Sequence, residues 1–176
     1  LREIESIKYG GNILDIGCSV GLFLEVVKKC SQYKWNLFGL EINSKSLQVA
    51  KKRIKAKFYN GPIYEENLTS NFFDCVTCFD VLEHDSNIKK NLNEIKRILK
   101  DDGLFVIQSP SYKSVMARLS GNNWDWWSVP DHVLHLTTKQ LSALLNEVGF
   151  MIVKKRTWEP RNDFILNVSG NIRKHF

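Results

Sequence analysis

Apolar positions along the chain follow two alternating patterns, short continuous runs and a helical repeat. Between the runs, apolar residues such as Leu22, Val26 and Cys30 recur every three to four positions, which predicts helices. The alternation is typical of βαβ units, so we expect one α/β domain over 1–176 with a doubly wound, mostly parallel sheet. The runs predict five strands, at 12–16, 35–40, 56–59, 73–79 and 104–108.

Polar residues predict where some of these helices begin and end. Ser44 is placed to cap the helix that carries Leu47 and Ala50, because a serine hydroxyl can accept from a free N–H of the first turn. A later helical pattern includes Leu99 and is predicted to end at 101–103.

The C-terminal third has a different pattern. Residues 109–136 show little periodicity but contain three closely spaced tryptophans, which favours a lid over the substrate more than a plug in the core. Thr137-x-x-Gln140 is a capping box that opens a helix, which Gly149 closes. Strands are predicted at 150–156 and 164–168.

The composition is that of one globular domain. At 176 residues, with 43% hydrophobic and 25% charged positions, the chain can bury a single main core. Its longest uncharged stretch, 103–112, is half of what a membrane-spanning helix needs, so membrane insertion is not expected. The N-terminus shows no apolar leader, which favours the cytoplasm.

The formal net charge is +6, and its lysines and arginines are spread over several short groups. We interpret these groups as solvated helix faces and strand ends in preference to a nucleic-acid surface. Cys75-x-x-Cys78 lies on a predicted strand, where residues three apart point to opposite faces, so the two thiols are not expected to share a metal. The oligomeric state is left open.

The most informative stretch is 13–21, in which a strand enters a turn of small residues and then a helix. A dinucleotide fingerprint would need glycines at 17, 19 and 22, but the chain has Gly17, Ser19 and Leu22. Asp15, at the end of the strand, suits a cation better than a phosphate, because a nearby negative charge attracts the one and repels the other.

Asp15, Gly17 and Gly21, together with Glu41 closing the second strand, resemble the class I S-adenosylmethionine-dependent methyltransferases, with Ser19 replacing the usual middle glycine. The resemblance implies a Rossmann-like methyltransferase fold and S-adenosyl-L-methionine as cofactor. It also implies that Glu41 binds both ribose hydroxyls, which a carboxylate can do. The predicted cofactor-binding residues are Asp15, Gly17, Ser19, Gly21, Glu41, Ile42, Pro62, Ile63, Phe79 and Asp80.

The stretches 73–84 and 132–137 are similar to the branch of small-molecule enzymes related to ubiquinone-biosynthesis O-methyltransferases. This resemblance implies direct displacement of the methyl group by a small-molecule acceptor, with oxygen as the expected acceptor atom. His84, just beyond the fourth strand, is the predicted catalytic base, because a hydroxyl acceptor must lose a proton. The predicted substrate-binding residues are Tyr112, Trp126, His132 and His135.

Three alternatives remain open from the sequence. The net charge allows an RNA-modifying methyltransferase, and Ser19 allows a non-catalytic module that binds the cofactor. No metal is assigned, although Asp80, Glu83 and His84 match positions that can hold a divalent ion in the ubiquinone branch.

Overall fold

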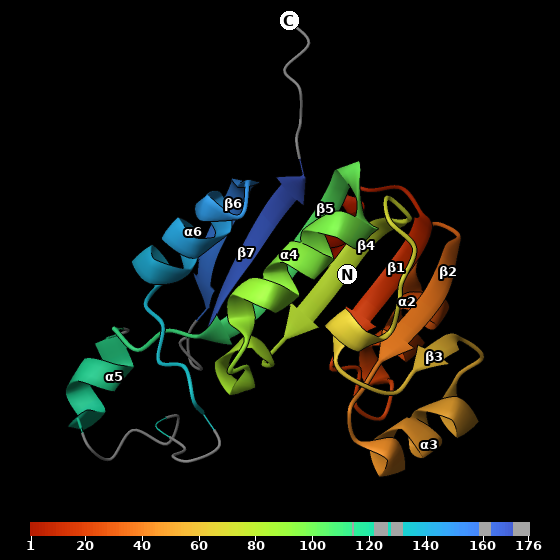
Figure 1. Cartoon of the computed structure of the whole chain (residues 1–176), viewed down its shortest axis with the longest axis horizontal. Coiled ribbons are helices and arrows are strands. Elements are labelled where there is room, and N and C mark those ends of the chain that lie inside the picture. Colours follow the sequence, from red (N-terminus) through yellow and green to blue (C-terminus); the bar gives the residue numbers. More distant parts are fainter. Residues whose placement is uncertain (114, 122–126, 128–131, 159–162, 171–176) are drawn as a thin grey trace, which may run out of the picture.

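A computed structural model describes residues 1–113, 115–121, 127, 132–158 and 163–170. Within these residues the chain forms one twisted seven-stranded sheet with helices on both faces (Figure 1). The strand order is β3-β2-β1-β4-β5-β7-β6, and the first five strands in the sequence pair in parallel. Strand β7 runs antiparallel to both of its neighbours. The predicted doubly wound, mostly parallel α/β fold is therefore confirmed.

The strands are β1 (Gly11–Ile16), β2 (Trp35–Leu40), β3 (Lys57–Tyr59), β4 (Phe73–Phe79), β5 (Leu99–Pro110), β6 (Phe150–Trp158) and β7 (Asp163–Gly170). The α-helices are α1 (Arg2–Glu5), α2 (Leu22–Cys30), α3 (Ser44–Arg53), α4 (Ile88–Ile98), α5 (Val115–Ser120) and α6 (Thr138–Glu147). Two short 3-10 helices are η1 (Ile63–Glu65) and η2 (Leu82–His84).

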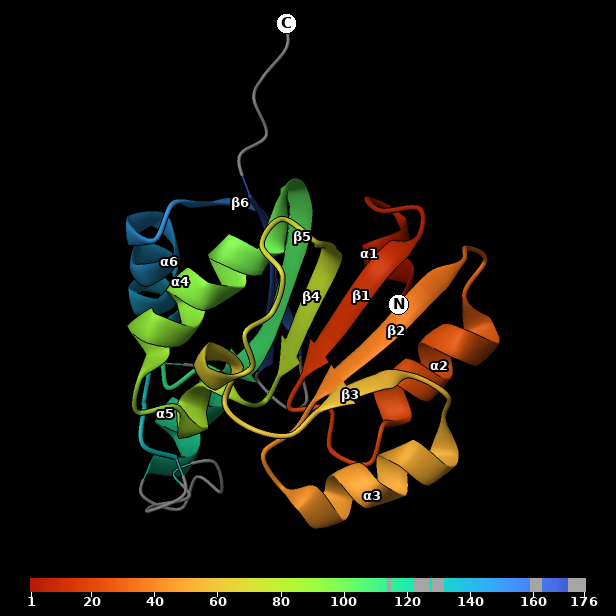
Figure 2. The ribbon, with the colours of Figure 1, turned by 45° about the vertical axis from the view of Figure 1, so that its right-hand side comes forward.

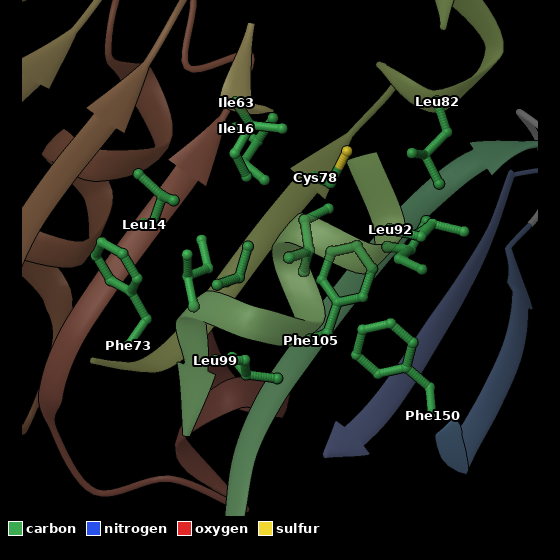
Figure 3. Packing of buried hydrophobic residues seen from close by; sticks show 14 of the residues in the cluster. Leu14, Ile16, Ile63, Phe73, Cys78, Leu82, Leu92, Leu99, Phe105 and Phe150 are labelled. Atoms are coloured by element: carbon green, nitrogen blue, oxygen red, sulfur yellow. The ribbon is translucent and has the colours of Figure 1, made fainter. Parts of the chain in front are cut away.

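Helices α4 and α6 cover one face of the sheet, and α1 and α2 lie on the other (Figures 1 and 2). Because successive residues of a strand point to opposite faces, Leu14 belongs to the larger core under α4 and Ile13 to the smaller one. Figure 3 shows the larger cluster, in which Phe105 packs on Phe150 of β6. Cys75 and Cys78 likewise lie in different clusters, as their spacing on a strand predicts.

Several predicted boundaries are wrong, including those of the strand predicted at 104–108, which spans Leu99–Pro110. The α3 cap is Asn43, whose side-chain oxygen accepts from the N–H groups of Lys45 and Ser46, so Ser44 is the first helical residue. Helix α4 ends at Ile98, because Leu99 already pairs with Phe73 in the sheet. The segment 101–103 lies inside the long strand β5, at a register shift between its two pairings with β4.

The predicted capping box is present at α6, where Thr137 and Gln140 bond to each other's main chain. Both C-terminal strands also form, and they build the antiparallel edge of the sheet. Within 109–136 the structure contains α5, a helix that the sequence pattern did not predict. Among the described residues, no helix has both the length and the apolar character needed to cross a bilayer.

Candidate active site

The turn after β1 brings main chain close to the ends of β2 and β4. Gly17, Ser19 and Gly21 all have left-handed backbone conformations, with φ of 71°, 47° and 80°. A Cβ atom on Gly17 would lie 2.3 Å from Val81 Cγ2, so no larger residue fits there. The N–H groups of Gly17 and Cys18 both donate to the carbonyl of Leu40, at 2.8 and 3.1 Å. The turn is therefore fixed to the end of β2.

Glu41 is held by the same turn. The N–H of Ser19 donates to its Oε2 at 2.9 Å, and the N–H of Asn43 donates to its Oε1 at 2.7 Å. The residue is 8% exposed. Because each carboxylate oxygen has two lone pairs, both oxygens can accept a further hydrogen bond. The main chain thus orients this carboxylate before any ligand arrives.

Asp15 is buried beneath this turn, at 4% exposure. Its Oδ1 accepts from Thr77 Oγ1 of the neighbouring strand at 2.7 Å. Burial raises the pKa of Asp15 to about 7, partly offset by the Thr77 hydrogen bond and reinforced by the charge of Glu41. A cation nearby would favour the ionised form of this carboxyl.

A cavity of about 530 Å³ opens at the carboxyl ends of β1, β2 and β4. This edge is where open α/β sheets bind ligands, and the volume is that of a small-molecule site. Asp15 and Gly21 lie outside its wall, whereas His84 is part of it. Eight of the ten predicted cofactor residues line it, namely Gly17, Ser19, Glu41, Ile42, Pro62, Ile63, Phe79 and Asp80.

A group of titratable side chains lies at the end of β4. Asp80 has a left-handed backbone with φ of 54°, and its carboxylate accepts from Gln108 Nε2 at 3.2 Å. Glu83 is 1% exposed and accepts from Ser109 Oγ at 3.2 Å. Burial raises the pKa of Glu83 to about 7. His84, next to it, is exposed, so the two residues of this pair have opposite environments.

The predicted substrate residues lie beyond His84. Tyr112 Oη and His132 Nδ1 are 2.9 Å apart, and the His132 ring packs edge-on against His84 at 4.7 Å. His135 packs against Tyr112, with ring centroids 4.4 Å apart. Trp126 lies outside the described residues, but its neighbour Trp127 packs on Tyr112. The structure thus brings three of the four predicted residues to one place, next to the wall of the cavity.

A family model for the methyltransferase domain matches residues 1–155. The chain belongs to the methyltransferase domain family. It is 33% identical over 113 residues to an uncharacterized protein of Methanocaldococcus jannaschii, covering 60% of this chain and 40% of that one. It is 28% identical over 112 residues to a ubiquinone biosynthesis O-methyltransferase of Glaesserella parasuis, covering 57% and 46%. The chain therefore matches less than half the length of these relatives.

Solved methyltransferase structures share the fold of this methyltransferase domain. A SAM-dependent methyltransferase from Aquifex aeolicus superposes with a TM-score of 0.77 at 15% identity, covering 97% of this chain and 88% of that one. A possible histamine N-methyltransferase from Thermotoga maritima gives 0.76 at 17%, covering 97% and 87%. The class I fold and S-adenosylmethionine as methyl donor follow from this family.

The residues present fit this cofactor. The fixed Glu41 carboxylate has free lone pairs for a vicinal diol such as that of ribose. Pro62 and Ile63 give the cavity an apolar wall on which a flat base can pack. Because Gly17 has no side chain, a ligand can approach the main chain closely there. The carboxylates of Asp15 and Asp80 suit a positively charged ligand. When bound, the cofactor supplies an electrophilic methyl group.

A metal ion could also be held near the cavity. Ligand atoms of Glu83, His84 and His132 lie within 4.8 Å of one another. The sequence alternative grouped Glu83 and His84 with Asp80, and the structure replaces Asp80 by His132 in the group. The place of His132 in this group could not be predicted from the sequence, because His132 follows a long segment without a periodic pattern.

Several cavity residues were not predicted. Tyr64 and Asn91 line the wall, since η1 packs against the first turns of α4. Asp85, Ser86 and Asn87 complete that side. All three directly follow the His84 turn, so proximity to the end of β4 was the one signal that could have indicated them.

Proposed function

We propose that this domain transfers the methyl group of S-adenosylmethionine to a hydroxyl oxygen of a small organic acceptor by direct displacement. One observation carries the proposal: His84 is the single imidazole of the described chain that lines the cavity. A hydroxyl must lose its proton to become a good nucleophile, and an imidazole is the side chain best suited to take it near neutral pH. The similarity to a ubiquinone biosynthesis O-methyltransferase supports the same chemistry.

The surroundings of His84 support its role as base. Its ring packs against His132, which in turn contacts the hydroxyl of Tyr112. The segment 132–134 is fixed to the His84 turn, because the N–H groups of Val133 and Leu134 both donate to the carbonyl of Glu83 at 2.9 Å. His84 can therefore take the proton from the acceptor while its ring stays packed against the buried pair of His132 and Tyr112.

The acceptor is held, in this proposal, by the residues that follow β5. Tyr112, His132 and His135 form an aromatic cluster beside His84. Tyr112 and His132 are buried and contact each other through their polar atoms, so they support the position of His84 behind the acceptor. Residues 109–136, including Trp126, serve as the substrate lid. The carboxyl ends of the strands are the expected position for such a cover.

The test is turnover of S-adenosylmethionine with a panel of phenols, catechols, amines and carbon acids. Oxygen acceptors are expected to be methylated, and His84→Ala to lower their turnover by about two to four orders of magnitude. Binding of S-adenosylhomocysteine measured by calorimetry should change little, which separates lost chemistry from lost cofactor. Methylation confined to amines, or turnover of His84→Ala within twofold of wild type, would contradict the proposal.

A further inference from the structure

Basic and acidic residues are distributed unequally along the chain. Residues 42–64 contain six basic residues and no acid, which leaves 19 basic and 19 acidic residues in the rest of the chain. The whole formal net charge of +6 therefore lies in one short stretch, which we call the basic segment. It comprises α3, β3, the first two residues of η1 and the connections between them. Its charged residues are Lys45, Lys51, Lys52, Arg53, Lys55 and Lys57.

None of these six charged side chains is buried, and most have no acidic partner among the described residues. All six side chains are exposed. Among the residues that the structure describes, Arg53 alone has an acidic partner, Glu25 at 2.9 Å. Basic residues elsewhere do have acidic partners, such as Lys100 with Asp74 and Lys154 with Glu3. In the described part of the chain, seven basic residues outside the segment have an acidic partner, whereas five of the six within it have none.

The basic segment borders the cavity. Strand β3 is the edge strand of the sheet, and α3 lies beside it at the carboxyl end of β2 (Figures 1 and 2). Ile42 at one end of the segment and Pro62, Ile63 and Tyr64 at the other all line the cavity wall. A polyanion on this surface would therefore lie next to the site of methyl transfer.

The surface suits a phosphate backbone better than a membrane or an acidic protein. The main apolar residues of α3, Leu47 and Ala50, are buried against the sheet, and Val49 is its one large apolar side chain that is exposed. A membrane-surface helix instead presents a broad apolar face to the lipid. Protein interfaces are depleted in lysine, whereas phosphate contacts are made mainly by lysine and arginine.

We propose that the outward face of the basic segment is a docking surface for the phosphodiester backbone of a nucleic acid. The surface lies outside the cavity, so the inference goes beyond the proposed function and does not depend on which small acceptor is methylated. The structure thereby distinguishes the basic segment from the other groups of lysines and arginines. From the sequence, all of these groups were interpreted as solvated helix faces and strand ends.

Fluorescence anisotropy with a labelled single-stranded RNA of about 20 nucleotides tests this, with DNA of the same sequence in parallel. Five unpaired cations predict a slope of log K against log salt of about −3.5, since each phosphate contact on a single strand contributes about −0.7. Affinity should therefore fall about a hundredfold between 50 and 200 mM salt. RNA and DNA should bind alike if the backbone alone is recognised.

The decisive variant is Lys45→Gln/Lys52→Gln/Lys55→Gln, which should reduce the magnitude of the slope by about 2 and weaken RNA binding at least tenfold. The matched control, Lys28→Gln/Lys34→Gln/Lys139→Gln, removes the same charge from exposed lysines elsewhere and should change affinity less than threefold. Binding of S-adenosylhomocysteine verifies that each variant is folded.

Three outcomes would overturn the inference. Wild type could fail to bind RNA at 50 mM salt, or both triple variants could weaken binding equally. Vesicles of phosphatidylcholine with one third phosphatidylglycerol could also bind more tightly than RNA, with the same dependence on the basic segment. Loss of RNA binding leaves small-molecule turnover intact, so the outcome is distinguishable from failure of the proposed function.

Discussion

The cofactor side of the site, built by β1, β2 and the turn between β1 and α2, is positioned mainly by the main chain. Gly17 and Cys18 bond to Leu40, and Ser19 and Asn43 bond to the Glu41 carboxylate. The acceptor side, beyond β4 and β5, has main-chain bonds from Val133 and Leu134 to Glu83, but side-chain contacts orient its rings. Its principal contacts join Tyr112 to His132 and His132 to His84.

This difference indicates which kinds of substitution should disturb each side of the site. Main-chain hydrogen bonds depend on glycine positions and strand ends, so a short spacing in the sequence determines them. Side-chain contacts between residues 48 positions apart, such as His84 and His132, can change with any single substitution. We therefore expect cofactor binding to be lost when a substitution changes the backbone of the turn. Acceptor methylation should be lost when a substitution changes the chemistry of a side chain.

The largest effect expected from a change of backbone comes from Gly17→Ala. Its Cβ would lie 2.3 Å from Val81 at a positive φ, so the turn must move away from the end of β4. Calorimetry should show cofactor affinity reduced more than a hundredfold, or about 3 kcal/mol. Gly149→Ala is the control, since that glycine also has positive φ but no atom within 4 Å of the added Cβ. It should cost about 1–2 kcal/mol of stability and leave cofactor binding unchanged.

A smaller effect concerns pH and Asp15. Because its pKa in the folded protein is about 7 and the cofactor carries positive charge, binding should favour the ionised carboxylate and release a proton below pH 7. Affinity should rise about fivefold from pH 6 to 7, about twofold more up to pH 8, and then level off. Calorimetry in two buffers of different ionisation enthalpy measures the released proton, and Asp15→Asn should abolish both effects. If Asp15→Asn releases as many protons on binding as wild type does, the released proton comes from another group.

The same carboxyl affects stability without cofactor. Its folded pKa is raised above the unfolded value of 3.8, so its contribution is present below pH 4 and is lost as the pH rises to about 7. Thermal melts of wild type minus Asp15→Asn should show this loss over that window. If the stability of wild type relative to Asp15→Asn instead increased from pH 4 to pH 7, the argument that burial raises this pKa would be contradicted.

The smallest effect is expected for Ser19→Gly. Serine at φ of 47° is strained, whereas glycine adopts that backbone freely, although it loses more chain entropy on folding. The net change should be below about 1 kcal/mol, equivalent to a shift in melting temperature of a few degrees. The N–H that donates to Glu41 remains, so cofactor affinity should stay within about threefold of wild type. A tenfold change would mean that the serine hydroxyl itself contacts the cofactor.

Much of the fold could be predicted from the sequence because the central strands β1, β4 and β5 are mostly buried on both faces and read as apolar runs. Strands 35–40 and 73–79 have the predicted bounds, and the Thr137 capping box forms. The errors arise where local signals compete. Asn43 and Ser44 are both good caps, and Leu99 fits the helical repeat of α4 although it pairs with β4.

The candidate site divides in the same way. Gly17, Ser19 and Glu41 could be predicted because they match the family motif that the sequence resembles, and they do line the cavity. The burial of Glu83 and its proximity to His132 could not, because they depend on how the segment after β5 returns across the end of β4. No periodic pattern in the sequence records that path.

The central claim is that the main chain holds Glu41 ready for the cofactor, independently of the acceptor side. Calorimetric titration with S-adenosylhomocysteine of wild type, Glu41→Ala and Tyr112→Phe tests it most directly. Wild type should bind one equivalent, and Glu41→Ala should lose about 3–6 kcal/mol, because each of two hydrogen bonds to a charged group contributes about 1.5–3 kcal/mol. Tyr112→Phe should bind like wild type. Equal affinity in Glu41→Ala, or a comparable loss in Tyr112→Phe, would contradict the account.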